Sequence, residues 1–291
     1  MTPLRKRMLE ELQLRNLSEN TVTAYVGAVR RFAQYFARSP EKLGPDQVRQ
    51  YLLYLLNEKK DNHNTIQVYR GALKFLYVRV LKQSWFEEQI PVPKKRRRLP
   101  TVLTPQEITR ILDHTINLKH WMIIATFYAT ALRCDELRHL KVSDIDSQRM
   151  ILHIRKAKGS VQRDIALSPA LLERLRVYYR WRKPKDWLFP SKQHPNHPLS
   201  DNSIRQLCSQ AGQRAGKLLV HPHLFRHACA THMLDAGADL RTIQILLGHA
   251  RLETTARYLH VSLQRLQAVR SPFDALELSP IHHCKEDGRR R

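Results

Sequence analysis

The chain has 291 residues, of which 50 are lysine or arginine and 26 are aspartate or glutamate, so its formal net charge is +24 at pH 7. Hydrophobic residues make up 42% of the sequence, which excludes a fully disordered, collagen-like or low-complexity chain. The excess of positive charge favours a polyanionic partner, above all a nucleic acid.

Membrane and disulfide-rich classes do not fit the sequence. It contains no apolar run near the roughly 20 residues that span a bilayer, and its first residues lack the apolar region of a signal peptide. The cysteines are dispersed without CxxC spacing, at Cys134, Cys208, Cys229 and Cys284. We therefore expect a cytoplasmic, nucleoid-associated protein with reduced thiols.

The first eighty-odd residues predict an all-α bundle, because apolar side chains recur there every three or four positions. Ser18 is a suitable N-cap for a helix that continues to Phe36, and Pro45 suits the first turn of a second helix. A third helix is expected after Asn64. We assign residues 1–88 to this N-terminal domain.

Residues 89–103 predict a linker. They contain three prolines and five consecutive basic residues, which neither form a core nor tolerate burial. The basic run could be an import signal or a solvated spacer, but in so basic a chain we favour a strap along DNA phosphates. Its residues are Lys94, Lys95, Arg96, Arg97 and Arg98.

Residues 104–270 predict a second, mainly helical domain with a small β-hairpin, so the chain as a whole is mainly α (α+β). Thr104 to Glu107 form a capping box, and residues 118–131 are apolar enough for a buried helix. Met150 to Ile154 and Ile165 to Leu167 alternate between apolar and polar residues around a turn at Gly159. Helices are expected from Pro169 to about Leu266, followed by a mobile tail over residues 271–291.

Three segments of this second domain carry residues suited to phosphate chemistry. They are ALRCDEL from Ala131, HPHLFRHACATH from His221 and LLGHARLETTARYLH from Leu246. Together they resemble the tyrosine recombinase (phage integrase) family, in particular its Xer-type and integron-integrase-like members. The order and separation of the segments match that family, and the N-terminal bundle is similar in organisation to its helical, SAM-like core-binding domain.

The resemblance implies a role for each matching residue. Tyr258 would attack a DNA phosphodiester and form a 3′-phosphotyrosyl link, while Arg133 and Arg226 would hold the non-bridging oxygens. His249 would donate a further hydrogen bond to the phosphoryl group, and His223 would act as general base or proton shuttle. Lys158 would protonate the leaving 5′-oxygen, and Glu136 would orient the site.

The chemistry requires these residue types. Guanidinium groups are permanently charged planar forks that match the oxygens of a reacting phosphate. A phenol with a pKa of about 10 is a weak nucleophile at neutral pH without help from cations or a base. The leaving 5′-alkoxide needs an acid.

Some assignments remain open. Lys156 competes with Lys158, which we prefer because the family places its lysine directly before the turn glycine, with an arginine further on, here Arg163. Ala131 replaces the glycine usual two residues before the first arginine. The histidines from His221 to His232 do not form a zinc ligand set, and His227 and His232 are expected to be structural.

We expect a site-specific DNA recombinase that acts on double-stranded recombination sites as a homotetramer at the synapse. The bond energy kept in the covalent intermediate makes a nucleotide unnecessary, so no cofactor or metal is predicted. Two alternatives remain: a type IB topoisomerase-like enzyme with the same chemistry, and a non-catalytic DNA-binding protein on the same fold.

Overall fold

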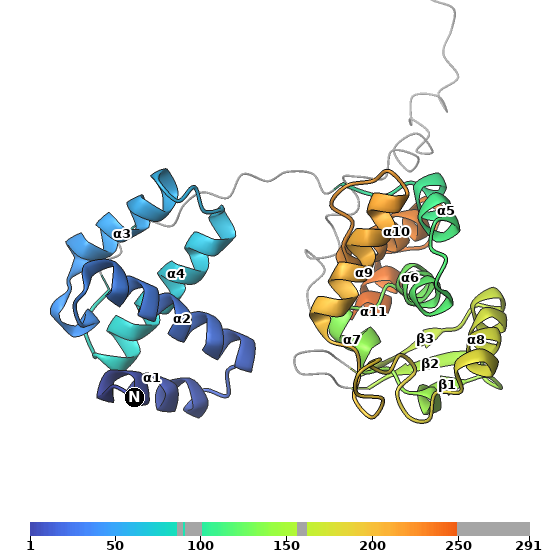
Figure 1. The fold of residues 1–291 in the computed structure, drawn as a ribbon, viewed down its shortest axis with the longest axis horizontal. Helices are drawn as coiled ribbons and strands as arrows, with labels where there is room; N and C mark the ends of the chain where they lie inside the picture. Colours follow the sequence, from blue (N-terminus) through green and yellow to red (C-terminus); the bar gives the residue numbers. More distant parts are fainter. Residues whose placement is uncertain (86–89, 91–100, 156–161, 249–291) are drawn as a thin grey trace, which may run out of the picture. The chain divides into compact units, whose positions relative to one another are not determined.

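The chain divides into two compact units, residues Met1–Arg98 and Leu99–Arg291, and each is described here by itself. The structure is a computed structural model that describes residues 1–85, 90, 101–155 and 162–248 (Figure 1). Within these residues it is mostly helical with one small sheet, as predicted.

The N-terminal unit is the predicted bundle. Ser18 caps its second helix by accepting a hydrogen bond from the Thr21 N–H at 3.2 Å, and Pro45 opens the third, both as expected. The next helix begins at His63, slightly before the predicted start, because the Asn62 side chain accepts from the Thr65 N–H. The elements are α1 (Pro3–Leu14), α2 (Glu19–Phe36), a 3-10 turn (Pro40–Lys42), α3 (Pro45–Asn57), α4 (His63–Phe75) and a π-helical turn (Leu76–Val80).

The core of this unit is apolar and rich in aromatic rings. The Tyr51 ring lies 5.3 Å from that of Phe32 and 5.8 Å from that of Tyr69, measured between centroids. The buried Tyr77 hydroxyl donates to the carbonyl oxygens of Pro40 and Leu43, at 3.1 and 2.9 Å. Helices α2 and α4 pack closely against each other.

The second unit is built around α6 (Leu118–Thr130), the predicted apolar helix, which packs against α10 and α8. In Figure 1 the sheet and α8 lie at one end of the unit, with α5 and α10 at the other. The predicted capping box at Thr104 is present at the start of α5. The helices are α5 (Pro105–Asp113), α6, α7 (Cys134–Arg138), a 3-10 turn (Val142–Asp144), α8 (Pro169–Arg182), α9 (Asp201–Arg214), α10 (Pro222–Asp235) and α11 (Leu240–Leu247).

The predicted hairpin is present and belongs to an antiparallel sheet of order β1-β2-β3. The two strands of the hairpin are β2 (Ile151–Ile154) and β3 (Arg163–Ala166). The two-residue strand β1 (Ile145–Asp146), which the sequence pattern did not reveal, pairs with β2 at the edge of the sheet. Met150 lies outside β2 because its φ is +55°. Buried Leu152, Ile154 and Ile165 direct one face of the sheet into the core of this unit.

Candidate active site

The first predicted site segment begins with a sharp turn after α6. The helix ends because Ala131, which is fully buried, takes a left-handed conformation with φ 52° and ψ 27°. Arg133 is then extended and forms the N-cap of the short α7. Alanine therefore adopts here the conformation that glycine adopts most easily, at a strain of about 1 kcal/mol.

Glu136 on α7 is the centre of a buried ion-pair cluster, and only 4% of its surface is exposed. Its carboxylate accepts from the Arg133 N–H at 2.8 Å and from Arg133 Nη1 at 2.9 Å. Arg163, at the start of β3, donates to both carboxylate oxygens through Nη1 and Nη2, each at 2.9 Å. Burial alone would raise the pKa of Glu136, but the hydrogen bonds from Arg163 and Arg133 outweigh it and lower the pKa to about 2.

Arg226 lies on α10, where only 3% of its surface is exposed. Nη1 donates to the carbonyl oxygen of Ala131 at 2.6 Å, and Nη2 donates to that of Leu247 at 2.7 Å. The left-handed turn at Ala131 thus directs a carbonyl at one predicted catalytic arginine and places the other arginine two residues further on.

The C-terminal end of α11 contacts both of the predicted catalytic arginines and Arg163. Three successive carbonyls there accept from three different arginines: Leu246 from Arg163 Nε at 2.6 Å, Leu247 from Arg226 Nη2, and Gly248 from Arg133 Nη2 at 3.1 Å. The last carbonyls of a helix lack helical partners and carry its negative dipole end, so cations are favourable at this position. Gly248 ends the helix in the left-handed conformation, with φ +59°.

His223 is the predicted base and lies in the first turn of α10. Burial lowers its pKa below the ordinary 6.5, and the charges of Arg226, His221, Arg205 and Arg133 lower it further. At neutral pH its imidazole is therefore uncharged and able to accept a proton.

The structure brings together Arg133, Glu136 and Arg226, with His223 within the field of both arginines. Lys158, His249, Tyr258 and the basic run Lys94 to Arg98 lie outside the described residues. Arg163 was not among the predicted site residues. The sequence places Arg163 after the hairpin turn, but this position does not predict that its side chain lies between Glu136 and α11.

The histidines of α10 do not point to a metal. The described part of the chain contains no group of three or more His, Cys, Asp or Glu residues placed to hold one. His232 is engaged elsewhere, because its Nδ1 lies 3.0 Å from the hydroxyl of Tyr128 on α6. Among the described helices, none is both long and apolar enough to cross a membrane.

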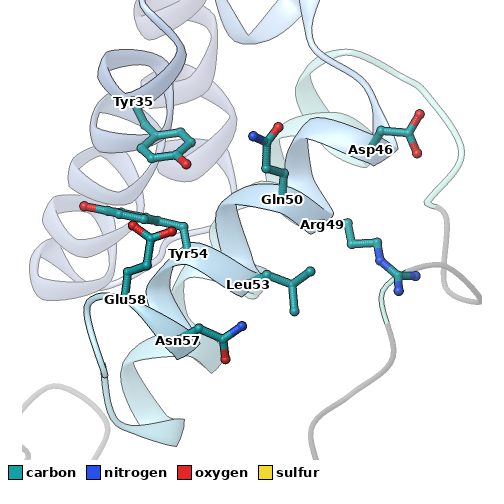
Figure 2. Close-up of a pocket in the computed structure, with 8 residues that line it drawn as sticks. All are labelled: Tyr35, Asp46, Arg49, Gln50, Leu53, Tyr54, Asn57 and Glu58. Atoms are coloured by element: carbon teal, nitrogen blue, oxygen red, sulfur yellow. The ribbon is translucent and has the colours of Figure 1, made fainter.

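A separate pocket of about 410 Å³ opens beside α3 in the N-terminal unit (Figure 2). The Tyr35 ring stands next to that of Tyr54, with 4.5 Å between centroids. Asp46, Arg49 and Glu58 give its lining mixed charge, and it contains none of the predicted catalytic residues. The candidate active site is therefore the cluster around Glu136 and the end of α11, and not this pocket.

Comparisons with known proteins agree with the resemblance. Residues 101–265 match the phage integrase family, and residues 4–87 match the N-terminal SAM-like domain of phage integrases. The y4qK protein of Sinorhizobium fredii, an integrase/recombinase by name, is 45% identical over 95% of this chain and 90% of its own length. Tyrosine recombinase XerA of Pyrococcus horikoshii is 32% identical over 88% of each chain.

Solved structures have the same fold. The crystal structure of XerA recombinase matches with a TM-score of 0.55 and 26% identity, covering 92% of this chain and 99% of that one. A lambda integrase dimer bound to a COC′ core site matches with a TM-score of 0.73 over 92% of this chain and 97% of its own. At 16% identity, the second likeness concerns the fold alone.

Proposed function

Because this chain belongs to the phage integrase family of tyrosine recombinases, enzymes that cut and rejoin DNA, we propose that Tyr258 is its nucleophile and that Arg133 and Arg226 hold the scissile phosphate. The protein is a site-specific recombinase whose partner is double-stranded DNA. Attack by the phenolic oxygen on phosphorus forms the 3′-phosphotyrosyl bond and breaks the bond to the 5′-oxygen. Attack by a 5′-hydroxyl on the same phosphorus then forms a new phosphodiester bond and breaks the bond to the Tyr258 oxygen, which reseals the strand.

The observation that carries the proposal is the concentration of positive charge at the end of α11. Arg133, Arg163 and Arg226 contribute three positive charges against the single negative charge of Glu136, which leaves a formal +2. A phosphodiester gains negative charge on its oxygens as the nucleophile attacks, so fixed cations stabilise the transition state more than the ground state. Arg133 is the exposed member of the cluster, with 30% of its side chain accessible to solvent.

The proton transfers follow from the remaining residues. Neutral His223 accepts the proton from Tyr258, Lys158 gives a proton to the leaving 5′-oxygen, and His249 donates to the phosphoryl group. Each bond change is thereby matched by a proton transfer, and no step needs a metal or a nucleotide.

We assign DNA binding to residues 1–88 and catalysis to residues 104–270, with the basic linker 89–103 along the phosphates. Four protomers would assemble two sites in a synapse, in the cytoplasm at the nucleoid.

Covalent trapping tests the nucleophile. The probe is a duplex selected for binding from a random-sequence pool and then nicked at successive positions, so that cleavage next to the nick becomes irreversible. We expect an SDS-stable protein–DNA adduct from the wild type without divalent metal, and none from Tyr258→Phe. Tyr179→Phe, an exposed tyrosine on α8, is the matched control and should form the adduct at the wild-type rate. An adduct from Tyr258→Phe would remove Tyr258 from this role.

A sulfur substitution tests the acid. Lys158→Ala should cleave an ordinary duplex slowly and recover on a 5′-thio leaving group, which needs no proton. Lys156→Ala should cleave both duplexes at similar rates. The reverse pattern would transfer the role to Lys156, and relaxation of supercoils without recombinant products would contradict recombination.

A further inference from the structure

Arg163 is a buried cation that reaches the proposed catalytic residues from a different element of the fold. Its side chain is 6% exposed, and its three guanidinium nitrogens all donate within the protein. Nε donates to the Leu246 carbonyl, and the two terminal nitrogens form a bidentate pair with Glu136. Because both of its terminal nitrogens pair with a carboxylate, Arg163 is oriented toward Glu136 and α11, and we assign it no contact with a DNA phosphate.

Its partners are the groups that hold the exposed arginine. Glu136 accepts from both the main chain and the guanidinium of Arg133, and the same guanidinium donates to the Gly248 carbonyl. Arg163 fixes both supports, because it binds Glu136 on one side and the last turn of α11 on the other. Bidentate pairing sets the orientation of the carboxylate as well as its distance.

Gly248 shows how closely Arg163 is packed. A Cβ atom added to this glycine would lie 3.0 Å from Arg163 Nη1 and 3.3 Å from Cζ. The guanidinium therefore lies directly against the backbone from which the chain continues to His249. Arg163 is thus packed against the residue that ends α11.

We propose that Arg163 is a positioning residue for strand cleavage, which acts on the scissile phosphate through Glu136 and Arg133 and through the end of α11. This inference rests on the proposed function of the same site. The charged groups that face Glu136 are Arg133 from the start of α7 and Arg163 from β3, while α11 contributes carbonyls to the two arginines. Without Arg163, burial would favour the protonated form of Glu136 and weaken its hold on Arg133.

The alternative is that Arg163 only stabilises the fold. A double substitution separates stabilisation from positioning for the Arg163–Glu136 pair as a unit, because Arg163→Met with Glu136→Gln removes the two charges of this pair and leaves neutral side chains of similar size. Replacing a buried ion pair in this way is often neutral for stability, whereas removing one partner is costly. Arg163→Met alone should therefore lower the melting temperature, and the double variant should recover most of that loss.

The test measures the melting temperature and the single-turnover rate of adduct formation on the nicked duplex, at enzyme concentrations that saturate the DNA. We expect Arg163→Met to lower the rate at least 100-fold, and the double variant to remain at least 30-fold below wild type despite its recovered melting temperature. Arg163→Lys, which keeps the charge and reaches one carboxylate oxygen, should retain more activity than Arg163→Met. DNA affinity should change less than threefold in each.

Ile165→Ala is the matched control, since Ile165 is a buried residue of the same strand, two positions from Arg163, and contacts the hydrophobic core. It should lower the melting temperature while keeping the rate within threefold of wild type. A second readout uses an Arg133→Lys background, in which Arg163→Lys should lower the rate by a smaller factor than it does in the wild type, because one of the two routes through which it acts is already altered.

Full recovery of the rate in the double variant would overturn the proposal, as would additive losses in the Arg133→Lys background. If Arg163→Met does not fold, Arg163→Lys decides alone: a wild-type rate contradicts positioning, and a lowered rate at a melting temperature matched by Ile165→Ala supports it. Absence of an adduct from the wild type would instead contradict the proposed function.

Discussion

The two units of this protein differ in how many charged side chains they bury. Within residues 1–85 and 90, Arg70 is the one charged side chain that is buried, and it donates to the Ile90 carbonyl. The described part of the second unit buries Glu136, Asp144, Arg163 and Arg226, and all of these except Asp144 belong to the candidate active site.

The two kinds of core differ in how firmly they fix the positions of side chains. An apolar core stabilises a bundle through non-directional burial and tolerates small shifts. Buried ion pairs cost desolvation energy, but their hydrogen bonds fix the positions of charged atoms. The buried charges of the second unit are thereby fixed in position, as the proposed reaction requires. Changes made in either unit should expose this difference.

Glu136→Ala should give the largest loss, because it leaves Arg163 and Arg133 without their carboxylate. We expect a decrease of about 3–5 kcal/mol in the free energy of unfolding at pH 7, measured by urea denaturation. The folded-state pKa is lowered to about 2 from 4.5, so this stabilisation is present above pH 4.5 and is lost as the pH falls toward 2. The gap between wild type and variant should accordingly narrow over that range; a constant gap would contradict the ionised state of Glu136.

Leu73→Ala truncates a fully buried side chain in the apolar unit. It should cost about 2–5 kcal/mol of stability through lost burial and a residual cavity. DNA affinity should weaken, while the cleavage rate at saturating enzyme stays within threefold of wild type. A loss of cleavage rate that persists at saturating enzyme would contradict the view that the N-terminal unit affects DNA binding and not the cleavage step.

Acid pH should affect cleavage before it affects binding. The pKa of His223 lies below 6.5 in the folded protein, so we expect adduct formation under subsaturating conditions to be constant from pH 8 to 6.5. Below the folded pKa the rate should fall about tenfold per pH unit as the base is protonated. His223→Gln should be slower and lack this acid limb, whereas His114→Gln, an exposed residue, should keep it.

The smallest effects are expected at two helix ends of the same geometry. Ala37 ends α2 and Ala131 ends α6, both in the left-handed conformation, but Ala37 is exposed and Ala131 is buried beside the site. Glycine relieves the strain and adds unfolded-state entropy, so each Ala→Gly change should shift stability by no more than about 1 kcal/mol. Calorimetry should show similar shifts, and a loss of cleavage confined to Ala131→Gly would identify this turn as part of the site.

Much of the fold was predictable because its signals are local. Caps at Ser18 and Thr104, the first-turn Pro45 and the apolar run of α6 all act within a few residues of themselves, and the structure confirms them. The start of α4 was misplaced because Asn62, not Asn64, supplies the capping oxygen. The two-residue strand β1 was missed since it is too short to show any alternation.

The residue types suited to phosphate chemistry, including Arg133, His223 and Arg226, can be read from the order of amino acids, because they occur in fixed local motifs. How the arginines are held becomes visible only in the folded protein. Arg163 pairs with Glu136 from 27 residues away and with Leu246 from 83 residues away, so its role depends on three elements packing together. Local spacing encodes helices and turns, whereas a buried charge acquires its partners only when distant segments exclude water around it.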